Sequence, residues 1–496
     1  MTNADPRAAR RADEELDEFQ SAERHPEYRV DLERIRFSPF FSRLSAVTQV
    51  ISQTGAGLAV HNRLTHSVKV AAVARAIAVH LSTDQGETGR AVADLGGCHP
   101  VVVQAAASAH DLGHPPFGHL GEQTLDRIAR EKFRLAEGFE GNAQTFRILT
   151  RLDEHDQPGV GLNLTAAVRA AVLKYPWLRG HGGGRRGGSR KFSAYVTDVD
   201  DMRGALAAYP LIEEGQQTIE CSIMDIADDI AYSLHDLDDF YRAGLLNQAT
   251  ISSEFRAWRR DLTELRALDA PALAIANRSP GHALELLWRR LEARDPWIAD
   301  PDAFERAVAK VTEEVVDGLL AVPFDGSLAS ERALAGFTSE WIAHLQASVF
   351  VTREPDARSG HVSLDRRAWH EVAVLKFLHE RFILDRPDLA VYQRGQASVL
   401  ERLVDGFAAW IDDAHDVRRA PRRLIDFVDL ATEDYLRVKR ESPDLIDVTS
   451  EEEIRRRATG RGVIDYVASL TDAQATSLDG LLVGQTERLW DAGQGL

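Results

Sequence analysis

The chain has 496 residues, of which 44% are hydrophobic, and its formal net charge is −18. This length suits two to four domain-sized units or one large helical body with a sizeable core. The negative charge disfavours nucleic acid as a partner, and the sequence holds no long lysine or arginine tract. Two cysteines, Cys98 and Cys221, provide neither a disulfide framework nor a thiolate metal site.

The sequence also argues against a membrane partner. The longest apolar runs, such as VKVAAVARAIAV, carry charges and are too short to cross a bilayer. The N-terminal sequence MTNADPRAARRADEELDEF lacks the apolar region of a secretory signal. Because cysteine usage is that of a reduced compartment, we expect a cytoplasmic protein.

Helical periodicity dominates the first half of the chain. Apolar residues three and four apart, such as Val70, Val73, Ala74 and Ile77, mark the first of these helices. The predicted helices there span residues 65–81, 99–113, 119–133, 163–176 and 221–244. Gly113 and the prolines that follow it should end the second helix.

The second half continues in the same way, with short breaks between helices. The predicted helices span residues 281–293, 301–321, 332–350, 369–383, 396–416 and 422–440. Residues 361–365 (HVSLD) are candidates for a small β-hairpin. We find no alternation of strands and helices and therefore predict an all-α fold.

The stretch HDLGHPPFGHLGE, residues 110–122, crowds histidines and carboxylates where a helix must stop. His110 and Asp111 are adjacent, so they point about 100° apart and can share an ion only at the helix end. His66, and Asp228 among apolar neighbours, are candidates for the remaining ligands, because a buried carboxylate needs a partner. Such a nitrogen and oxygen set suits Mn²⁺, Mg²⁺ or Fe²⁺, with Zn²⁺ as an alternative. The competing interpretation is a set of separate, individually satisfied polar residues.

Five segments together resemble one known family. They are NRLTHSVKVA, HDLGHPPFGHLGE, FEGNAQTFRIL, LKYPW and MDIADDIAYSLHDLDD, in the family's order. They resemble the HD-domain dGTP triphosphohydrolases, which cleave a deoxynucleoside triphosphate (dNTP) into deoxynucleoside and inorganic tripolyphosphate. The matches run from about Asp31 to Gly244, with weaker ones at VAVLKFLHERFI and RGVIDYVASLTDAQA.

The resemblance implies an HD-domain helical bundle with a C-terminal helical extension. We therefore expect a flexible segment over residues 1–30, a metal-dependent phosphohydrolase core over 31–250, and a helical region over 251–496 packed on that core. A soft boundary near residues 245–290 separates the two halves.

The resemblance also implies a role for each matching residue. His66, His110, Asp111 and Asp228 match the metal ligands. His119 and Glu122 match the pair that works on the attacking water, since an imidazole is basic near neutral pH and a carboxylate one turn away can hold its tautomer. His114 matches a position close to the triphosphate. The alternative is that His114 hydrogen-bonds a metal ligand and does not contact the substrate.

Other matches concern the substrate. Arg63 and Lys191 match cations that meet phosphate oxygens, and Lys174 and Tyr175 match a phosphate-side position. The glycine-rich basic stretch around residues 180–190 is either a solvated loop or a basic flap over a polyphosphate.

The sugar is assigned to the helix that carries Asp228. Tyr232 and Asp236 lie four and eight residues beyond it, on one helix face. In the family pattern, Asp236 accepts the 3′-hydroxyl and the Tyr232 ring fills the space of a 2′-hydroxyl, although core packing is the alternative for Tyr232. Gln49 matches a polar residue on the sugar side.

The chain departs from the family in two places. Gly141 stands where many members carry a histidine, which removes a candidate acid for the leaving group. The KFSAYVTD segment differs from the aromatic-rich version, so the partner of Lys191 is left open. Asp229 competes with Asp228 for the ligand role. We interpret four further histidines as structural or surface residues: His61, His80, His99 and His235.

The predicted function is hydrolysis of a dNTP, with dGTP the favoured guess, by metal-assisted attack of water on the α-phosphorus. The alternatives are another HD phosphohydrolase (a nucleoside monophosphate phosphatase or a guanosine-tetraphosphate hydrolase) and a non-catalytic nucleotide sensor. The divalent metal is expected to be Mn²⁺ or Mg²⁺, with Fe²⁺ or Zn²⁺ as alternatives. By analogy with the family, we expect a homo-oligomer, from dimer to hexamer. An allosteric nucleotide is a further candidate ligand.

Overall fold

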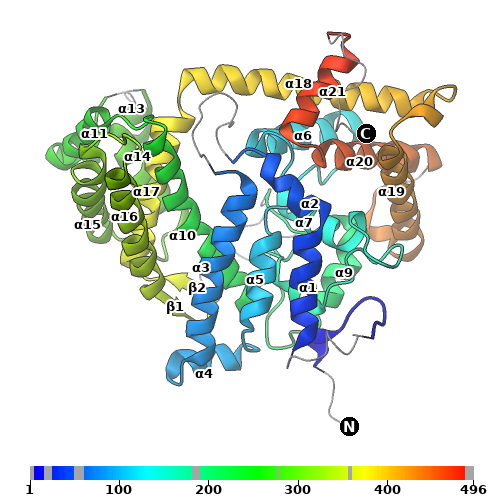
Figure 1. The fold of residues 1–496 in the computed structure, drawn as a ribbon, viewed down its shortest axis with the longest axis horizontal. Coiled ribbons are helices and arrows are strands. Elements are labelled where there is room, and N and C mark those ends of the chain that lie inside the picture. Colours follow the sequence, from blue (N-terminus) through cyan, green and yellow to red (C-terminus); the bar gives the residue numbers. More distant parts are fainter. Residues whose placement is uncertain are drawn as a thin grey trace.

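A computed structural model describes residues 5–15, 25–49, 61–180, 190–275, 279–355, 360–448 and 450–485. The fold is all-α, as predicted. Four helices pack side by side at its centre, and the candidate site is built on three of them (Figure 1). They are α1 (Pro26–Phe37), α3 (Arg63–Thr83), α5 (Pro100–Ala109) and α10 (Ile219–Arg242).

Local sequence signals explain where the central helices begin. Asn62 caps α3, and its side chain and that of Thr65 satisfy each other's backbone N–H groups. Pro100 opens α5, where its missing N–H costs nothing. The Thr218 side chain accepts from the backbone of Cys221 and caps α10.

Smaller helices surround this centre. They are α2 (Pro39–Arg43), α4 (Glu87–Asp94), α6 (Gly118–Phe133), α7 (Gly141–Arg147), α8 (Ala166–Ala171) and α9 (Val199–Leu206). The helices predicted over 65–81, 119–133 and 221–244 are confirmed. The one predicted over 163–176 is shorter: it begins after Thr165, whose side chain caps it, and ends at Ala171.

The second half forms two groups of helices, joined by the long helix α18 across one edge of the molecule (Figure 1). The first group is α11 (Gln248–Arg260), α12 (Leu262–Ala267), α13 (Ala270–Ile275), α14 (His282–Arg294), α15 (Pro301–Val311), α16 (Leu328–Ala347) and α17 (Arg366–His379). The rest are α18 (Pro387–Asp412), α19 (Arg422–Glu441), α20 (Glu451–Ala468) and α21 (Asp472–Leu482).

The two strands of the described residues form one antiparallel pair. Strand β1 (Val349–Val351) pairs with β2 (Val362–Leu364), with Phe350 opposite Ser363. The β2 strand lies within the predicted hairpin segment 361–365. The helix predicted over 332–350 ends earlier, at Ala347, because its β-branched end joins this pair.

One helix, α3, is long and apolar enough to cross a membrane by length and composition alone, and half of that apolar stretch is buried inside the protein. It lies at the centre of the molecule (Figure 1). One hydrophobic cluster extends from Tyr28 to Leu478 and includes residues of both halves. The division into three ranges, with its boundary near 245–290, stays a prediction.

A buried ion network ties the C-terminal helices to the core. The guanidinium of Arg147 on α7 lies 3.2 Å from Asp198, 3.1 Å from Asp434 on α19 and 2.8 Å from Asp465 on α20. All four side chains are fully buried. Because an unpaired buried charge is costly, this network holds α19 and α20 against α7.

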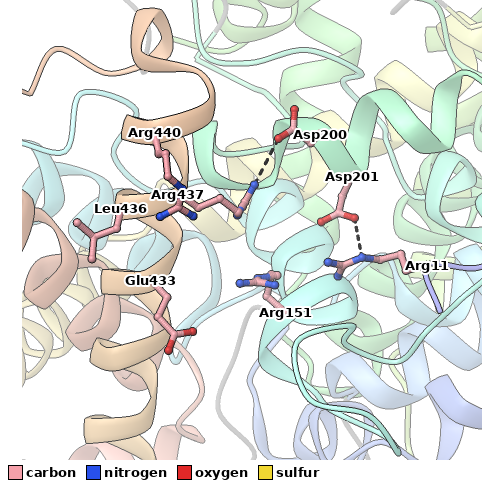
Figure 2. A pocket seen from close by; sticks show the side chains of 8 residues that line it. All are labelled: Arg11, Arg151, Asp200, Asp201, Glu433, Leu436, Arg437 and Arg440. Carbon is pink, nitrogen blue, oxygen red and sulfur yellow. Dashed lines mark hydrogen bonds and ion pairs between the residues drawn. The ribbon is translucent and has the colours of Figure 1, made fainter.

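A polar groove of about 580 Å³ opens beside this network (Figure 2). It lies between α19, α9 and the N-terminal segment, and four arginines line it. Arg437 pairs with Asp200 (3.3 Å) and Arg11 with Asp201 (2.8 Å). The carboxylates thus balance part of the positive charge of the arginines. The two ion pairs connect the N-terminal segment and α19 to α9.

Candidate metal centre and active site

The chain turns sharply after α5, and this turn carries the densest group of candidate site residues. His110 is the C-cap residue of α5, and Gly113 follows it in the turn. A Cβ at Gly113 would lie 2.1 Å from the carbonyl oxygen of Gly141, so helix α7 packs directly on this backbone. A side chain there would displace α7 and the turn together.

Three predicted ligands meet in one cluster. The Nε2 atoms of His66 and His110 lie 3.2 Å and 3.6 Å from Oδ1 of Asp228. One ligand atom from each of the three residues lies within 4.8 Å of the others. Both histidines are buried. The cluster thus joins the start of α3, the end of α5 and the middle of α10.

His110 is oriented so that one ring nitrogen faces the cluster. Its Nδ1 donates to the carbonyl oxygen of Ala107 (2.8 Å). Its Nε2 is buried and has no hydrogen-bond partner among the described residues. A ligating histidine commonly has its second ring nitrogen bound to a carbonyl in this way, which leaves the lone pair of the first for a cation. The donor set therefore fits a divalent metal ion.

Asp111 lies next to this cluster but is held by other partners. Its Oδ2 accepts a hydrogen bond from Arg63 (2.9 Å), and its Oδ1 lies 3.0 Å from Nδ1 of His114. The same Oδ1 is 3.6 Å from Nε2 of His110. Asp111 thus stands between the metal cluster and His114, and its role as a fourth ligand stays a prediction.

The two neighbouring aspartates of α10 point to different partners. Asp228 faces the histidines and also accepts from Nζ of Lys174 (3.0 Å). Asp229 pairs with Nζ of Lys376 on α17 (2.7 Å). Of the two, only Asp228 belongs to the three-residue cluster.

The carboxylates dominate the electrostatics of this cluster. Burial alone would lower the pKa of His110, but Asp111 and Asp228 outweigh it and raise that pKa to about 9. Burial would raise the pKa of Asp228, but Lys174 and His110 hold it well below its usual range. Asp228 is therefore an anion that attracts positive charge at this point.

A second cluster lies beside the first. Nδ1 of His119 is 3.2 Å from Oε2 of Glu122, one turn along α6. The ring centroids of His114 and His119 are 5.3 Å apart. His119 is the exposed member of the cluster, with 61% of its side chain exposed, whereas Glu122 is buried. An exposed imidazole on a buried carboxylate can take a proton from a water that enters from solvent.

Lys191 bridges two buried carboxylates. Its Nζ lies 2.7 Å from Oε1 of Glu122 and 2.8 Å from Oε1 of Glu140. Burial would raise the pKa of Glu122, but His119 and Lys191 hold it well below its usual range. Sequence reasoning missed Glu140, although the FEGNAQ segment contains it. The other oxygen of Glu140 caps α7 by accepting from Asn142 (2.6 Å).

Tyr232 and Asp236 lie on the face of α10 that meets α17. The Tyr232 ring centroid is 6.4 Å from that of His66 and 5.4 Å from that of His379. The carboxylate of Asp236 contacts Nδ1 of His379, and both side chains are buried. Sequence reasoning missed His379, although it lies in the weakly matching segment VAVLKFLHERFI. Tyr232, Asp236 and His379 line one small cavity, together with Lys376.

The remaining predicted residues lie around these groups. Gln49 is half-buried, and its Oε1 has no hydrogen-bond partner among the described residues. A Cβ on Gly118 would lie 2.9 Å from Arg63 and 3.6 Å from the carbonyl oxygen of Gln49, so the three are neighbours. Tyr175 packs on Trp177 (5.7 Å between ring centroids). The glycine-rich stretch 181–189 lies outside the described residues.

Comparison with known proteins identifies the family. The HD domain model matches residues 63–233. A deoxyguanosinetriphosphate triphosphohydrolase-like protein of Streptomyces coelicolor is 32% identical over 475 residues, which cover 92% of each chain. The protein of that name from Corynebacterium glutamicum is 30% identical, over 82% of this chain and 88% of its own. The chain belongs to the HD-domain deoxyguanosinetriphosphate triphosphohydrolase family.

A further relative matches a shorter part of the chain at higher identity. A deoxyguanosinetriphosphate triphosphohydrolase-like protein 2 of Mesorhizobium japonicum is 41% identical over 238 residues, 45% of this chain and 47% of its own. Members of the HD-domain family bind divalent metal, and the cluster of His66, His110 and Asp228 lies within the matched domain. The resemblance noted in the sequence is thereby confirmed at the level of the family.

Proposed function

We propose that this protein hydrolyses a dNTP to the deoxynucleoside and inorganic tripolyphosphate, with dGTP the favoured substrate. One observation carries the proposal: a metal-ligand cluster and an acid–base pair stand side by side, with Asp111 and His114 between them. The relatives' printed names point to the same substrate class.

His66, His110 and Asp228, with Asp111 beside them, would hold the divalent metal. Mn²⁺ or Mg²⁺ fits this mixture of imidazole and carboxylate best, with Fe²⁺ or Zn²⁺ as alternatives. When bound, the ion supplies positive charge that polarises a phosphoryl oxygen and steadies the triphosphate.

His119 takes the proton from the attacking water. Glu122 holds the imidazole from its Nδ1 side, so that Nε2 can act as the base. The water oxygen forms a bond to the α-phosphorus and the bond between that phosphorus and the 5′-oxygen breaks. The 5′-oxygen takes up a proton and leaves as the deoxynucleoside's hydroxyl, while the water oxygen stays in tripolyphosphate.

Arg63, Lys174 and Lys191 supply the charge that a triphosphate needs in a protein of net charge −18. Lys174 and Lys191 each touch a carboxylate of one of the two clusters, and Arg63 touches Asp111 between them. Within about 10 Å such local cations outweigh the distant surface charge, because salt screens the latter. Tyr175 and Gln49 complete the phosphate and sugar sides, while Tyr232 and Asp236 select the deoxyribose.

Incubation with each of the four dNTPs, alone and in pairs, with Mg²⁺ or Mn²⁺, tests the proposal. Separation of the products should give deoxynucleoside and tripolyphosphate in equal amounts. Release of phosphate or pyrophosphate would instead indicate another HD phosphohydrolase, such as a nucleoside monophosphate phosphatase or a guanosine-tetraphosphate hydrolase. Binding of dNTP without turnover would indicate a nucleotide sensor.

The pairs of dNTPs also test regulation, since one nucleotide that accelerates hydrolysis of another would be an allosteric effector. We further propose a cytoplasmic homo-oligomer, between dimer and hexamer, that acts without a membrane or nucleic-acid partner. Light scattering of the purified protein measures the oligomeric state, and a monomer would contradict it.

A further inference from the structure

His235 lies directly behind the candidate ligand His66. Its Nδ1 is 3.4 Å from Nδ1 of His66, and its ring stands almost perpendicular to that of His66, at 88°. His235 is buried, with 3% of its surface exposed. The sequence alone classified it among the structural or surface histidines.

The chemistry of the two facing nitrogens allows one productive arrangement. Nε2 of His66 faces Asp228 and the metal cluster, so a ligating His66 must keep its lone pair there and carry its proton on Nδ1. Nδ1 of His235 must then be the acceptor, with the His235 proton on Nε2. Two protonated Nδ1 atoms at this distance would repel each other.

We propose that His235 is a positioning residue that accepts the Nδ1 proton of His66 and so fixes the tautomer and the ring orientation of that metal ligand. The inference rests on the proposed metal centre. Such partners of ligating histidines are commonly carboxylates, carbonyls or waters. A neutral imidazole in this place leaves His66 less basic than a carboxylate would.

A second histidine packs against His235. The ring of His61 stacks on it at 5.2 Å, with 17° between the planes. His61 itself is anchored by Asp239, which accepts from its backbone N–H (3.0 Å).

Helix α10 links this partner to the metal cluster. His235 follows Asp228 by seven residues, which is two helical turns, so both lie on the same face. One helix therefore supplies a ligand and also holds a ligand from α3. A shift of α10 would move both at once.

Mn²⁺ binding measured by calorimetry on the full chain tests the proposal. His235→Leu should weaken Mn²⁺ affinity by about 10- to 100-fold, because the acceptor is removed while the volume is nearly kept. His235→Gln offers an amide oxygen as acceptor and should recover most of that loss. His80→Leu is the matched control, since His80 is exposed on the same helix as His66.

The outcomes separate the inference from the proposed function. Wild-type protein that binds no Mn²⁺, Mg²⁺, Fe²⁺ or Zn²⁺ would overturn the metal centre itself. Normal Mn²⁺ affinity in His235→Leu, or an equal loss in His235→Gln, would overturn only the role of His235. Should His235→Leu fail to fold, ¹⁵N spectra of histidines in the Mg²⁺-loaded wild type decide: a protonated Nδ1 on His235 overturns the inference.

Discussion

The backbone N–H of Phe117 donates a hydrogen bond to Oδ1 of Asp472 (2.9 Å), across 355 residues of chain. Phe117 has a φ angle of 66°, in the left-handed region that a bulky residue rarely adopts. It precedes helix α6, which carries His119. The second oxygen of Asp472 accepts from the backbone of Thr48 (3.0 Å). The start of α21 thus holds the turn before α6 in an unfavourable conformation.

Asp472→Ala should therefore slow turnover several-fold and lower the free energy of unfolding by about 1–2 kcal/mol, because two backbone donors lose a charged acceptor. Mn²⁺ affinity should stay unchanged, since no proposed ligand is touched. Kinetics, thermal unfolding and calorimetry on one preparation measure the three effects. Asp472→Asn keeps an acceptor oxygen and is the control. Full activity in Asp472→Ala would show that Phe117 holds its conformation without this bond.

The two aspartates of α10 give a sharper comparison. Asp228→Ala should abolish bound metal and hydrolysis, because one of about four protein ligands is lost. Asp229→Ala should be milder, since Asp229 pairs with Lys376 and not with the histidines. Metal content by plasma emission and activity test both. The reverse order of severity would move the ligand role to Asp229.

Substitution of His119 distinguishes an effect on turnover from an effect on binding. His119→Ala should keep metal and substrate binding but slow turnover by about 10² to 10⁴, the usual contribution of a positioned base. Because most of its side chain is exposed, its removal should leave stability nearly unchanged. Single-turnover kinetics measure the step. Weakened binding with unaltered turnover would reassign His119 to substrate positioning.

The sugar contacts predict a change in selectivity. If the proposed sugar site is right, Tyr232→Ala should narrow the preference for dGTP over GTP by roughly 10-fold or more, because the ring would occupy the volume of a 2′-hydroxyl. Asp236→Asn should weaken both substrates alike, by about 5- to 10-fold in kcat/KM, since a charged acceptor becomes neutral. Hydrolysis of the matched pair by both variants is the measurement. An unchanged ratio in Tyr232→Ala would make the tyrosine a packing residue.

Glu220 makes stability depend on pH. Burial raises its pKa to about 7 from 4.5, and the nearest guanidinium atom of Arg7 is 3.9 Å from Oε1. Because the folded value lies above the unfolded one, the contribution of Glu220 is complete below pH 4.5 and is lost as pH rises through 7. Glu220→Gln should thus stabilise the protein at pH 8, by up to about 3 kcal/mol, and little at pH 4.5. Melting temperatures that shift equally at both pH values would contradict this.

The sequence predicted α3, α6 and α10 well, because their apolar periodicity agrees with the tertiary packing, whereas it did not predict α1. Helices α3, α6 and α10 follow the predicted ranges within two residues at each end. The end of the helix predicted over 332–350 is wrong, because the partner strand at residues 362–364 decides it from a distance. Strand pairing across a loop leaves no periodic signal in a helix-rich stretch.

For the candidate site, motif order identified His66, His110 and Asp228, which the structure brings together. Glu140 and His379 were missed and His235 was interpreted as a structural or surface residue, because all three are ordinary residues of helices or turns in sequence. Each acquires its meaning through a contact with another segment: Lys191, Asp236 and His66, respectively. Such contacts depend on how helices pack, which single-chain patterns do not encode.

The arrangement around Arg147 limits which amino-acid substitutions related sequences can accept at these positions. One guanidinium contacts three aspartates from α19, α20 and the segment before α9, with all four side chains out of reach of water. Loss of Arg147 would leave these buried carboxylates without the cation they share, so a substitution at that position alone is not a neutral step. These four positions should therefore change in concert among relatives, and an aligned set of family sequences should show them as one covarying group.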